Sequence, residues 1–190
     1  MSTQRRWQAF GFWLPPALGH ALVVAWASLR VEPYFAPWLV FPLLIGAAIG
    51  AGLAWLARFR QLADLKLLVA GTLAAGMVCV AMQHWFAYRQ AIQRYHQREA
   101  ALLEKAPLAG AGALALAGER PPTSVYDFLR GDAQRGRVLI AGWQATGVAC
   151  WLSWFLDAML VVATALAMVF LWRPRLARSS ALDQAIVPAP

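Results

Sequence analysis

The chain has 190 residues, of which 61% are hydrophobic and only 14% charged, and it carries ten Trp and a net charge of +8. A soluble domain has about a quarter charged residues, so the composition predicts an all-α integral membrane protein and argues against a soluble one. The basic excess does not predict nucleic-acid binding, because no basic cluster carries an aromatic pattern such as an RNP motif. We expect the lipid bilayer as the main partner, with basic residues flanking the apolar spans.

The first predicted span covers residues 12–29. Pro15 and Pro16 lack amide donors, so they suit the start of a helix or a kink. The basic start, the apolar stretch and the sequence AWAS also resemble a cleaved secretory signal. We expect a retained helix instead, because His20 and the two prolines interrupt the apolar stretch.

The second predicted span covers residues 37–57 and is about 20 residues long, which is enough to cross a hydrocarbon core. It contains Gly46 and Gly50 in a GxxxG pattern, which lets helix backbones approach closely. The pattern fits packing within one chain and also fits a dimer.

The third predicted span covers residues 67–86, and no Gly or Pro interrupts the next 20 residues. The sequence therefore predicts one long helix whose second half leaves the membrane. Tyr88, Ile92, Tyr95 and Leu102 lie at helical spacing on that half and form an apolar stripe. This stripe either faces a partner protein or packs on the chain's own loop.

Residues 87–137 form the predicted extramembrane region, which contains the second half of the long helix, a loop and a short amphipathic helix. Within it, the Gly- and Pro-rich stretch 106–122 indicates an irregular loop. Spans three and four are thus predicted to be joined by a connection of about 60 residues.

The short amphipathic helix follows Ser124. Ser124 and Asp127 have the spacing of a capping pair, in which the side chain of the first residue accepts an amide hydrogen bond from the second. We expect this helix to lie at the membrane surface and to be limited by Gly131 and Gly136.

Residues 138–172 are apolar almost throughout and exceed the length of one span. We expect the part through Gly147 to lie in the interface or to form a re-entry turn. The fourth span would then end where Pro174 blocks the helix. Residues 173–190 would be a basic and then disordered C-terminal tail, and residues 1–11 a basic N-terminus.

Four spans place both termini on the same side of a membrane. The short segments around Arg5, Arg58 and Arg173 are basic, which predicts cytoplasmic termini. The connection between spans three and four also carries eight basic residues, but loops of about 60 residues largely escape the positive-inside rule. The overall pattern resembles that of bacterial inner-membrane proteins, and we expect that location.

The fourth span contains one carboxylate, Asp157. An ionisable residue inside a span is a functional candidate, and it is expected to face the helix bundle. Counted along the helices, Asp157 lies ~24 Å above Arg173, and Gln83 lies ~25 Å above Lys66. The matching depths predict a contact of Asp157 with Gln83 or with the adjacent His84.

The two spans also carry small and polar residues on the same faces. Ser153 shares the helix face of Asp157, and Gly76 shares the face of Gln83. We therefore include Ser153 among the candidate polar contacts, and Gly76 with Gly46 and Gly50 among the candidate positions of close helix packing.

The two cysteines, Cys79 and Cys150, lie in apolar segments and do not form a CxxC pattern. Zinc and thioredoxin-like chemistry therefore fail on spacing. The depths of the cysteines differ by ~14 Å. This separation argues against a disulfide, whose Cα atoms lie within about 7 Å, unless the fourth span begins with a bent piece.

Asp157 has two interpretations. In the first it is a structural hydrogen-bonding group between spans three and four, and in the second it forms a proton relay or an ion site with His84. We favour the first. The residue types Ser153, His84 and Asp157 also occur in hydrolases, but no motif of a triad, a phosphate loop or a metalloprotease is present.

The sequence thus predicts a non-enzymatic scaffold or accessory subunit of a membrane complex, without a cofactor or a metal site. A protein partner or self-association is expected, because a plain bundle carries a GxxxG pattern and a projecting apolar stripe. The alternative is an oligomeric channel or a component of a proton-coupled transporter that uses Asp157.

Overall fold

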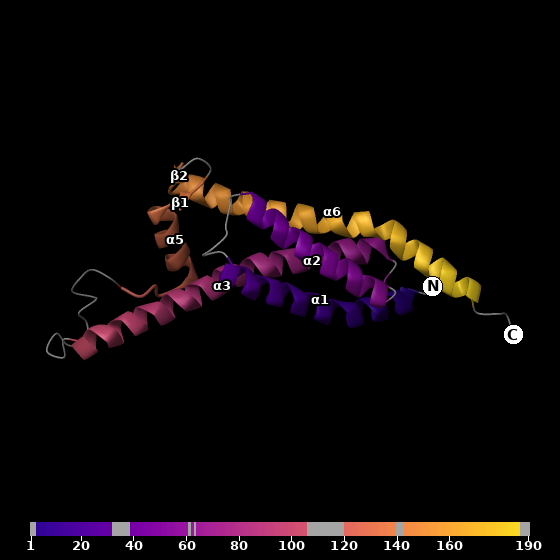
Figure 1. Cartoon of the computed structure of the whole chain (residues 1–190), viewed down its shortest axis with the longest axis horizontal. Coiled ribbons are helices and arrows are strands. Elements are labelled where there is room, and N and C mark those ends of the chain that lie inside the picture. Colours follow the sequence, from indigo (N-terminus) through magenta and orange to yellow (C-terminus); the bar gives the residue numbers. More distant parts are fainter. Residues whose placement is uncertain are drawn as a thin grey trace.

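A computed structural model describes residues 3–31, 39–60, 62, 64–105, 120–139 and 143–186 of this chain. It contains helices α1 (Thr3–Val31), α2 (Val40–Phe59), α3 (Leu65–Lys105), α5 (Val125–Arg135) and α6 (Val148–Ile186), with strands β1 (Arg137–Val138) and β2 (Gln144–Ala145). The described chain is nearly all helical (Figure 1). Most of the predicted irregular loop, residues 106–119, lies outside the described residues.

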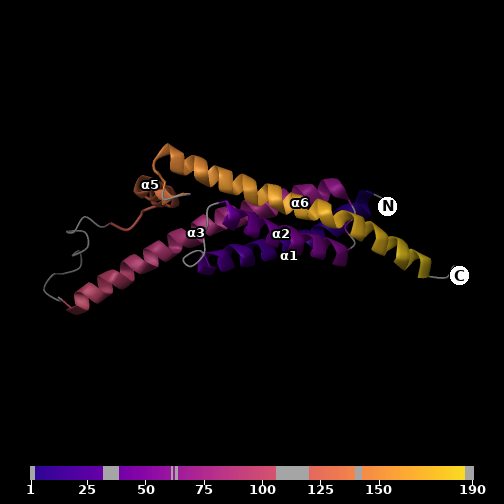
Figure 2. The ribbon, with the colours of Figure 1, turned by 45° about the horizontal axis from the view of Figure 1, so that its top comes forward.

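Four helices, α1, α2, α3 and α6, are long and apolar enough to cross a membrane. This finding confirms the predicted number of candidate spans. The start of α1 and the end of α6 lie at one end of the bundle, and α5 with the two strands lies towards the other (Figure 1 and Figure 2). We call these the terminal end and the α5 end.

Helix α1 begins at Thr3 and continues through Pro15 and Pro16, so of the two expected roles, helix start or kink, the prolines do not have the first. Proline has a φ that a helix accepts. It costs one hydrogen bond, because it has no amide hydrogen, and its ring clashes with the carbonyl group one turn earlier. Packing of α1 on α3 offsets this cost. The face of α1 that lies in the bundle consists of fully buried residues at a spacing of four: Trp13, Ala17, Ala21 and Ala25.

Helix α2 packs closely on α6 through its two GxxxG glycines. A Cβ atom at Gly46 would lie 2.9 Å from the Cβ of Thr164, and one at Gly50 would lie 2.7 Å from the Cβ of Met168. Both added atoms would also meet backbone carbonyls of α6. Only glycine permits this approach of two helix backbones, so the GxxxG pattern is used for packing between two helices of the same chain.

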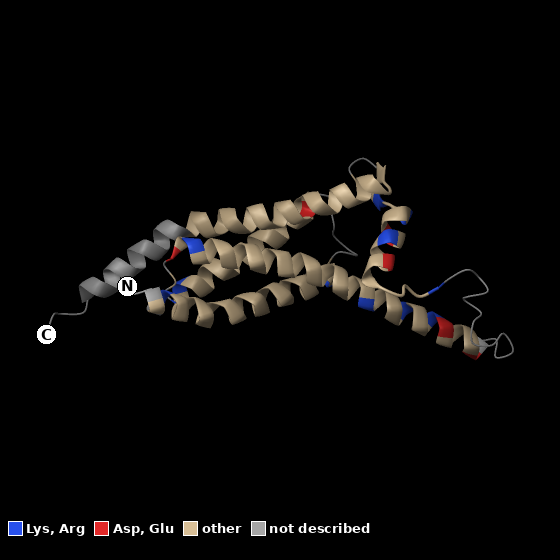
Figure 3. Ribbon diagram, turned by 180° about the vertical axis from the view of Figure 1, so that it is seen from behind, with Lys and Arg blue, Asp and Glu red and all other residues tan. Residues whose placement is uncertain are grey.

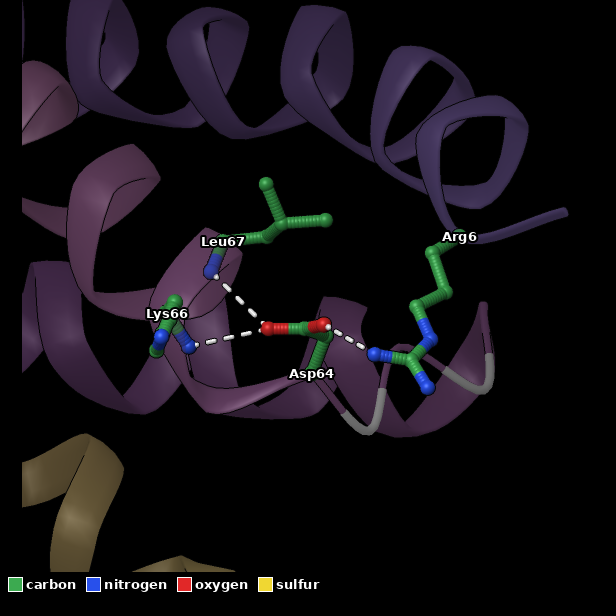
Figure 4. A network of polar contacts seen from close by, with 4 residues as sticks. All are labelled: Arg6, Asp64, Lys66 and Leu67. Atoms are coloured by element: carbon green, nitrogen blue, oxygen red, sulfur yellow. Dashed lines mark hydrogen bonds and ion pairs between the residues drawn. The ribbon is translucent and has the colours of Figure 1, made fainter. Parts of the chain in front are cut away.

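Asp64 fixes the start of α3 at the terminal end, as Figure 4 shows. Its Oδ1 accepts hydrogen bonds from the amides of Lys66 at 3.0 Å and Leu67 at 3.3 Å, which satisfies two of the free donors of the first turn. Its Oδ2 accepts a hydrogen bond from the Arg6 guanidinium of α1 at 3.4 Å. One carboxylate therefore caps α3 and ties its start to α1.

Helix α3 has 41 residues, which corresponds to ~62 Å and is twice the length of α2. Its second half runs on beyond the other three long helices (Figure 1). Figure 3 shows that charged residues gather on this half and on α5, whereas the bundle between the two ends is almost free of charge.

Helix α5 begins after Ser124, whose Oγ accepts the amide hydrogen bond of Asp127 at 3.1 Å, as the capping pair predicts. The Asp127 carboxylate in turn accepts a hydrogen bond from the Thr123 hydroxyl. The hydrogen bonds of Thr123 and Ser124 hold the pKa of Asp127 below its ordinary value. The expectation that Gly131 limits this helix is wrong, because the backbone stays helical to Arg135 and turns at Gly136.

The stretch before the fourth long helix, which is predicted to lie in the interface or to form a re-entry turn, contains a short β-ribbon. Strands β1 and β2 form an antiparallel ribbon that pairs Arg137 with Ala145 and Val138 with Gln144, and α6 begins only at Val148. This β-branched and aromatic stretch pairs its backbone groups across the ribbon instead of within a helix.

The predicted helix end at Pro174 is also wrong, because α6 continues to Ile186. A proline interrupts one turn of hydrogen bonds, and the backbone on both sides of it keeps its helical conformation. The tail expected to be disordered is therefore helical through residue 186, and residues 187–190 lie outside the described residues.

The close approach of α2 and α6 leads to a first prediction. Gly50→Ala places a methyl group against the α6 backbone, and we expect it to lower the free energy of unfolding by about 1–3 kcal/mol. Denaturant titration of the purified protein in detergent micelles measures this change. Gly19→Ala in α1 is the matched control, since its Cβ would meet nothing within 4 Å among the described residues. A Gly50→Ala protein as stable as the Gly19→Ala protein would contradict the close approach.

Candidate functional site

The candidate site lies around Asp157, in the part of α6 that is near the α5 end of the bundle. Asp157 is nine residues beyond the start of α6, which corresponds to ~14 Å along the helix. Its side chain is 18% exposed. A carboxylate with so little access to solvent needs a positive charge or several hydrogen-bond donors as partners.

The partner of Asp157 is Arg137, the first residue of β1. The two side chains form an ion pair and hydrogen bond between the guanidinium and Oδ2 of the carboxylate. The Arg137 side chain is 24% exposed, so solvent screens this pair only in part. The ion pair therefore fastens the segment after α5 onto the fourth long helix.

Gly136 makes this arrangement possible. Its φ of 84° lies in the left-handed region, which residues with a Cβ rarely adopt. An added Cβ would also lie 2.6 Å from the Cγ2 of Thr146 and 3.0 Å from the carbonyl oxygen of Ala145. This turn ends α5 and brings the next residue, Arg137, within reach of α6.

Asp157 and Arg137 line a recess of about 210 Å³ between α1, α2, α3, α5 and α6. Its wall also contains the polar side chains of Gln83, His84 and Asp132 and the aromatic rings of Phe41, Phe128 and Trp154. Oδ1 of Asp157 is buried and has no hydrogen-bond partner among the described residues. The recess is thus a polar chamber with an available acceptor oxygen at the α5 end of the bundle.

No hydrogen bond or ion pair joins Asp157 to Gln83 or His84 among the described residues. Gln83 instead donates a hydrogen bond to Oγ of Ser28 on α1 at 2.7 Å. The His84 ring makes an edge contact with Trp154, with 5.5 Å between the ring centroids. All three predicted residues nevertheless line the same recess, so the depth argument finds their level in the bundle but not their partners.

Ser153 is not part of the contact either. Its hydroxyl donates to the carbonyl oxygen of Cys150 in its own helix at 2.8 Å, and the residue is buried. Cys150 and Cys79 are both buried and free. Gly76, the third predicted packing position, lies against α6, where an added Cβ would be 2.9 Å from Cγ2 of Val162.

The predicted stripe on the second half of α3 is divided. Its near end packs on the chain itself, because the Tyr88 ring contacts Phe128 of α5 with 6.0 Å between centroids. Ile92 is half-buried, and Tyr95 lines a groove between α3 and α5. Leu102, at the far end, remains 39% exposed.

Sequence reasoning missed two charged residues that organise the ends of the bundle. Asp64 directly precedes a long apolar run, which is a helix-start signal. Arg137 was grouped with the other basic residues of the long connection. The position of Arg137 between the predicted surface helix and the fourth span was the feature that could have indicated a pairing with Asp157.

The ion pair leads to a second prediction. Arg137→Gln leaves the Asp157 carboxylate without its cation, and we expect it to lower the free energy of unfolding by about 1–3 kcal/mol. The double variant Arg137→Gln with Asp157→Asn removes both charges and is expected to recover most of this loss. Equilibrium unfolding of the wild type, both single variants and the double variant gives the coupling energy.

Arg130→Gln serves as the control for that cycle, because Arg130 is exposed on α5 and substitutions at such positions change stability by only about 0.5 kcal/mol. Strictly additive effects of the two substitutions at Arg137 and Asp157 would show that the side chains do not interact.

Comparison with family models, curated proteins and solved structures gives no match. Among the described residues, no group of three or more His, Cys, Asp or Glu side chains is placed to hold a metal ion. The function therefore has to follow from the geometry of this chain's own residues.

Proposed function

We propose that this chain is a non-enzymatic integral membrane protein of the bacterial inner-membrane type and serves as a scaffold or accessory subunit of a membrane complex. The observation that carries the proposal is the length of α3. A bundle of four apolar helices anchors the chain, and one of these helices continues as a charged arm at the α5 end.

The length argument is simple. The 20 residues of α2 correspond to ~30 Å, the thickness of a hydrocarbon core. The 41 residues of α3 correspond to ~62 Å. Its second half carries Arg89, Arg94, Arg98 and Glu99, and charges at this density are too costly to place in lipid. The second half of α3 therefore projects into water in the proposed arrangement.

The charges favour cytoplasmic termini. Segments 5–6, 58–66 and 173–183, which belong to the terminal end, contain eight Lys and Arg with two acidic residues. The other nine basic residues of the chain are accompanied by seven acidic ones. Basic residues in short segments beside a span stay on the cytoplasmic side. The α3 arm and α5 would then face the periplasm, where a partner would meet them.

The exposed end of the arm is the proposed contact for a partner. Tyr88 is covered by α5, so the near end of the stripe is used within the chain. Leu102 is two further turns beyond Tyr95 and keeps its exposure. A second copy of the chain or another membrane protein would bury this side chain against its own apolar surface.

A charge at this position tests the proposal. We expect Leu102→Asp to weaken the complex at least about tenfold, because it would place an unpaired carboxylate in an apolar contact. The measurement is the distribution of the chain between complex and free form on native gels of membranes dissolved in mild detergent. Gln97→Asp adds the same charge on the opposite face of α3 and is expected to leave this distribution unchanged.

Two results would contradict the scaffold proposal. One is a wild-type chain that migrates as a monomer, and the other is an equal effect of the Leu102 and Gln97 substitutions. Membrane extraction of each variant serves as the check that both proteins insert.

Transport remains the second candidate function, and the free acceptor atom of Asp157 favours it. Oδ1 is buried in a recess of about 210 Å³ that His84 also lines, and an ionisable residue inside a span is a candidate for an ion pathway. The ion pair with Arg137 opposes this role, because it already engages the other oxygen of the carboxylate.

Proton flux into liposomes separates the two candidates. The scaffold proposal predicts that liposomes containing the purified chain acidify no faster than empty ones under a proton gradient, as a pH-sensitive dye reports. A flux that is lost in Asp157→Asn but kept in Glu104→Gln, an exposed site on α3, would replace the scaffold by transport.

A further inference from the structure

We propose that the groove between α3 and α5 binds a phosphate group, carried either by a lipid headgroup or by a soluble phosphate ester. This groove has a volume of about 610 Å³ and is distinct from the Asp157 recess, although both share part of their walls. The inference does not depend on the protein partner proposed above.

Four arginines from three parts of the chain line the groove. Arg94 and Arg98 stand one turn apart on α3, Arg120 precedes α5, and Arg135 closes α5 at its last residue. Folding thus brings together cations that are up to 41 positions apart in the sequence. Convergence of separate elements distinguishes this groove from a basic face on a single helix.

The hydrogen bonds of two of these arginines leave their charge uncompensated. Arg94 donates to the amide oxygen of Gln90 at 3.3 Å, and Arg135 donates to the carbonyl oxygen of Gly131 at 3.4 Å. Both acceptors are neutral. Neither arginine, nor Arg120, forms an ion pair with a carboxylate among the residues that the structure describes.

Two carboxylates also line the groove, so the balance of charge matters. Asp127 is engaged by the Thr123 hydroxyl at the start of α5. Asp132 lines both the groove and the Asp157 recess. Arg94, Arg120 and Arg135 alone outnumber the two carboxylates, which leaves the groove with an excess of positive charge.

This excess and the geometry of arginine select phosphate. A guanidinium group donates two parallel hydrogen bonds to the oxygens of a phosphate, and a tetrahedral phosphate presents oxygens to several arginines at once. Tyr95 and Gln90, which also line the groove, add a hydroxyl and an amide as neutral donors. The floor is apolar, with Leu29 and Ala87, and would accept the carbon part of the ligand.

The height of the groove fits the headgroup region of a bilayer. Gln90 lies 25 residues beyond Leu65, which corresponds to ~38 Å along α3. A hydrocarbon core is about 30 Å thick and its polar region adds several ångströms on each side. The lower wall of the groove therefore lies at the level of lipid phosphates in the proposed arrangement, and its upper wall is open to water.

Binding of two phosphate sources to the full-length protein tests the inference. In the first arm, native mass spectrometry counts phosphatidic acid retained by the protein, with phosphatidylcholine for comparison. In the second arm, calorimetry follows inorganic pyrophosphate added to the protein in a zwitterionic detergent. At least one source is expected to bind, and the arm that responds identifies the lipid or the soluble ester.

The variant Arg94→Gln with Arg135→Gln is expected to weaken this binding at least about tenfold. The matched control is Arg89→Gln with Arg130→Gln, which removes the same charge from the same two helices outside the groove and is expected to change binding less than about twofold. The variant Arg94→Lys with Arg135→Lys keeps the charge, and we expect an intermediate loss because the two-pronged hydrogen bonds disappear.

Two outcomes would overturn the inference. One is the absence of binding in both arms, and the other is an equal loss in the groove pair and the control pair, which would indicate attraction to the general positive surface. Circular dichroism of each variant verifies the helix content, and the lysine pair provides the answer if the glutamine pair does not fold.

Discussion

The thickness of a hydrocarbon core is the constraint on which the proposed arrangement depends. Helix α2 matches that thickness, whereas α3 is twice as long. In the proposed arrangement half of α3 leaves the lipid, because a helix cannot shorten without losing its backbone hydrogen bonds. That half then becomes the wall on which α5 packs, through Tyr88 and Phe128, and the same packing creates both the Asp157 recess and the arginine groove.

Two contacts hold the fourth long helix in this frame by different means. Near the middle, Gly46 and Gly50 let α2 touch the backbone of α6, so dispersion over a close surface acts without any charge. At the α5 end, Arg137 reaches Asp157 from outside the helices. The ion pair with Asp157 thus holds the segment that contains Arg137 against the bundle. The positive φ of Gly136 turns the chain so that Arg137 can reach Asp157.

Much of the helical frame follows from the sequence, since long apolar runs have few other solutions and Ser124 carries its own start signal. The partner of Asp157 does not follow. Counting residues gives the height of a side chain along its helix but not the rotation of each helix about its own axis. Gln83 and His84 therefore lie at the predicted level but have other partners, Ser28 and Trp154. The arginine groove could not be predicted from the sequence for a related reason, because its two walls come together only when α5 packs on α3.

The central claim is that α3 passes through the membrane and projects on the side opposite the termini. Labelling of single cysteines with a membrane-impermeant maleimide in intact spheroplasts tests it most directly, in a protein whose buried Cys79 and Cys150 are replaced by alanine. We predict that Gln97→Cys on the arm is labelled before lysis and that Gln4→Cys near the start of α1 is labelled only afterwards. Labelling of Gln97→Cys only after lysis would contradict the account.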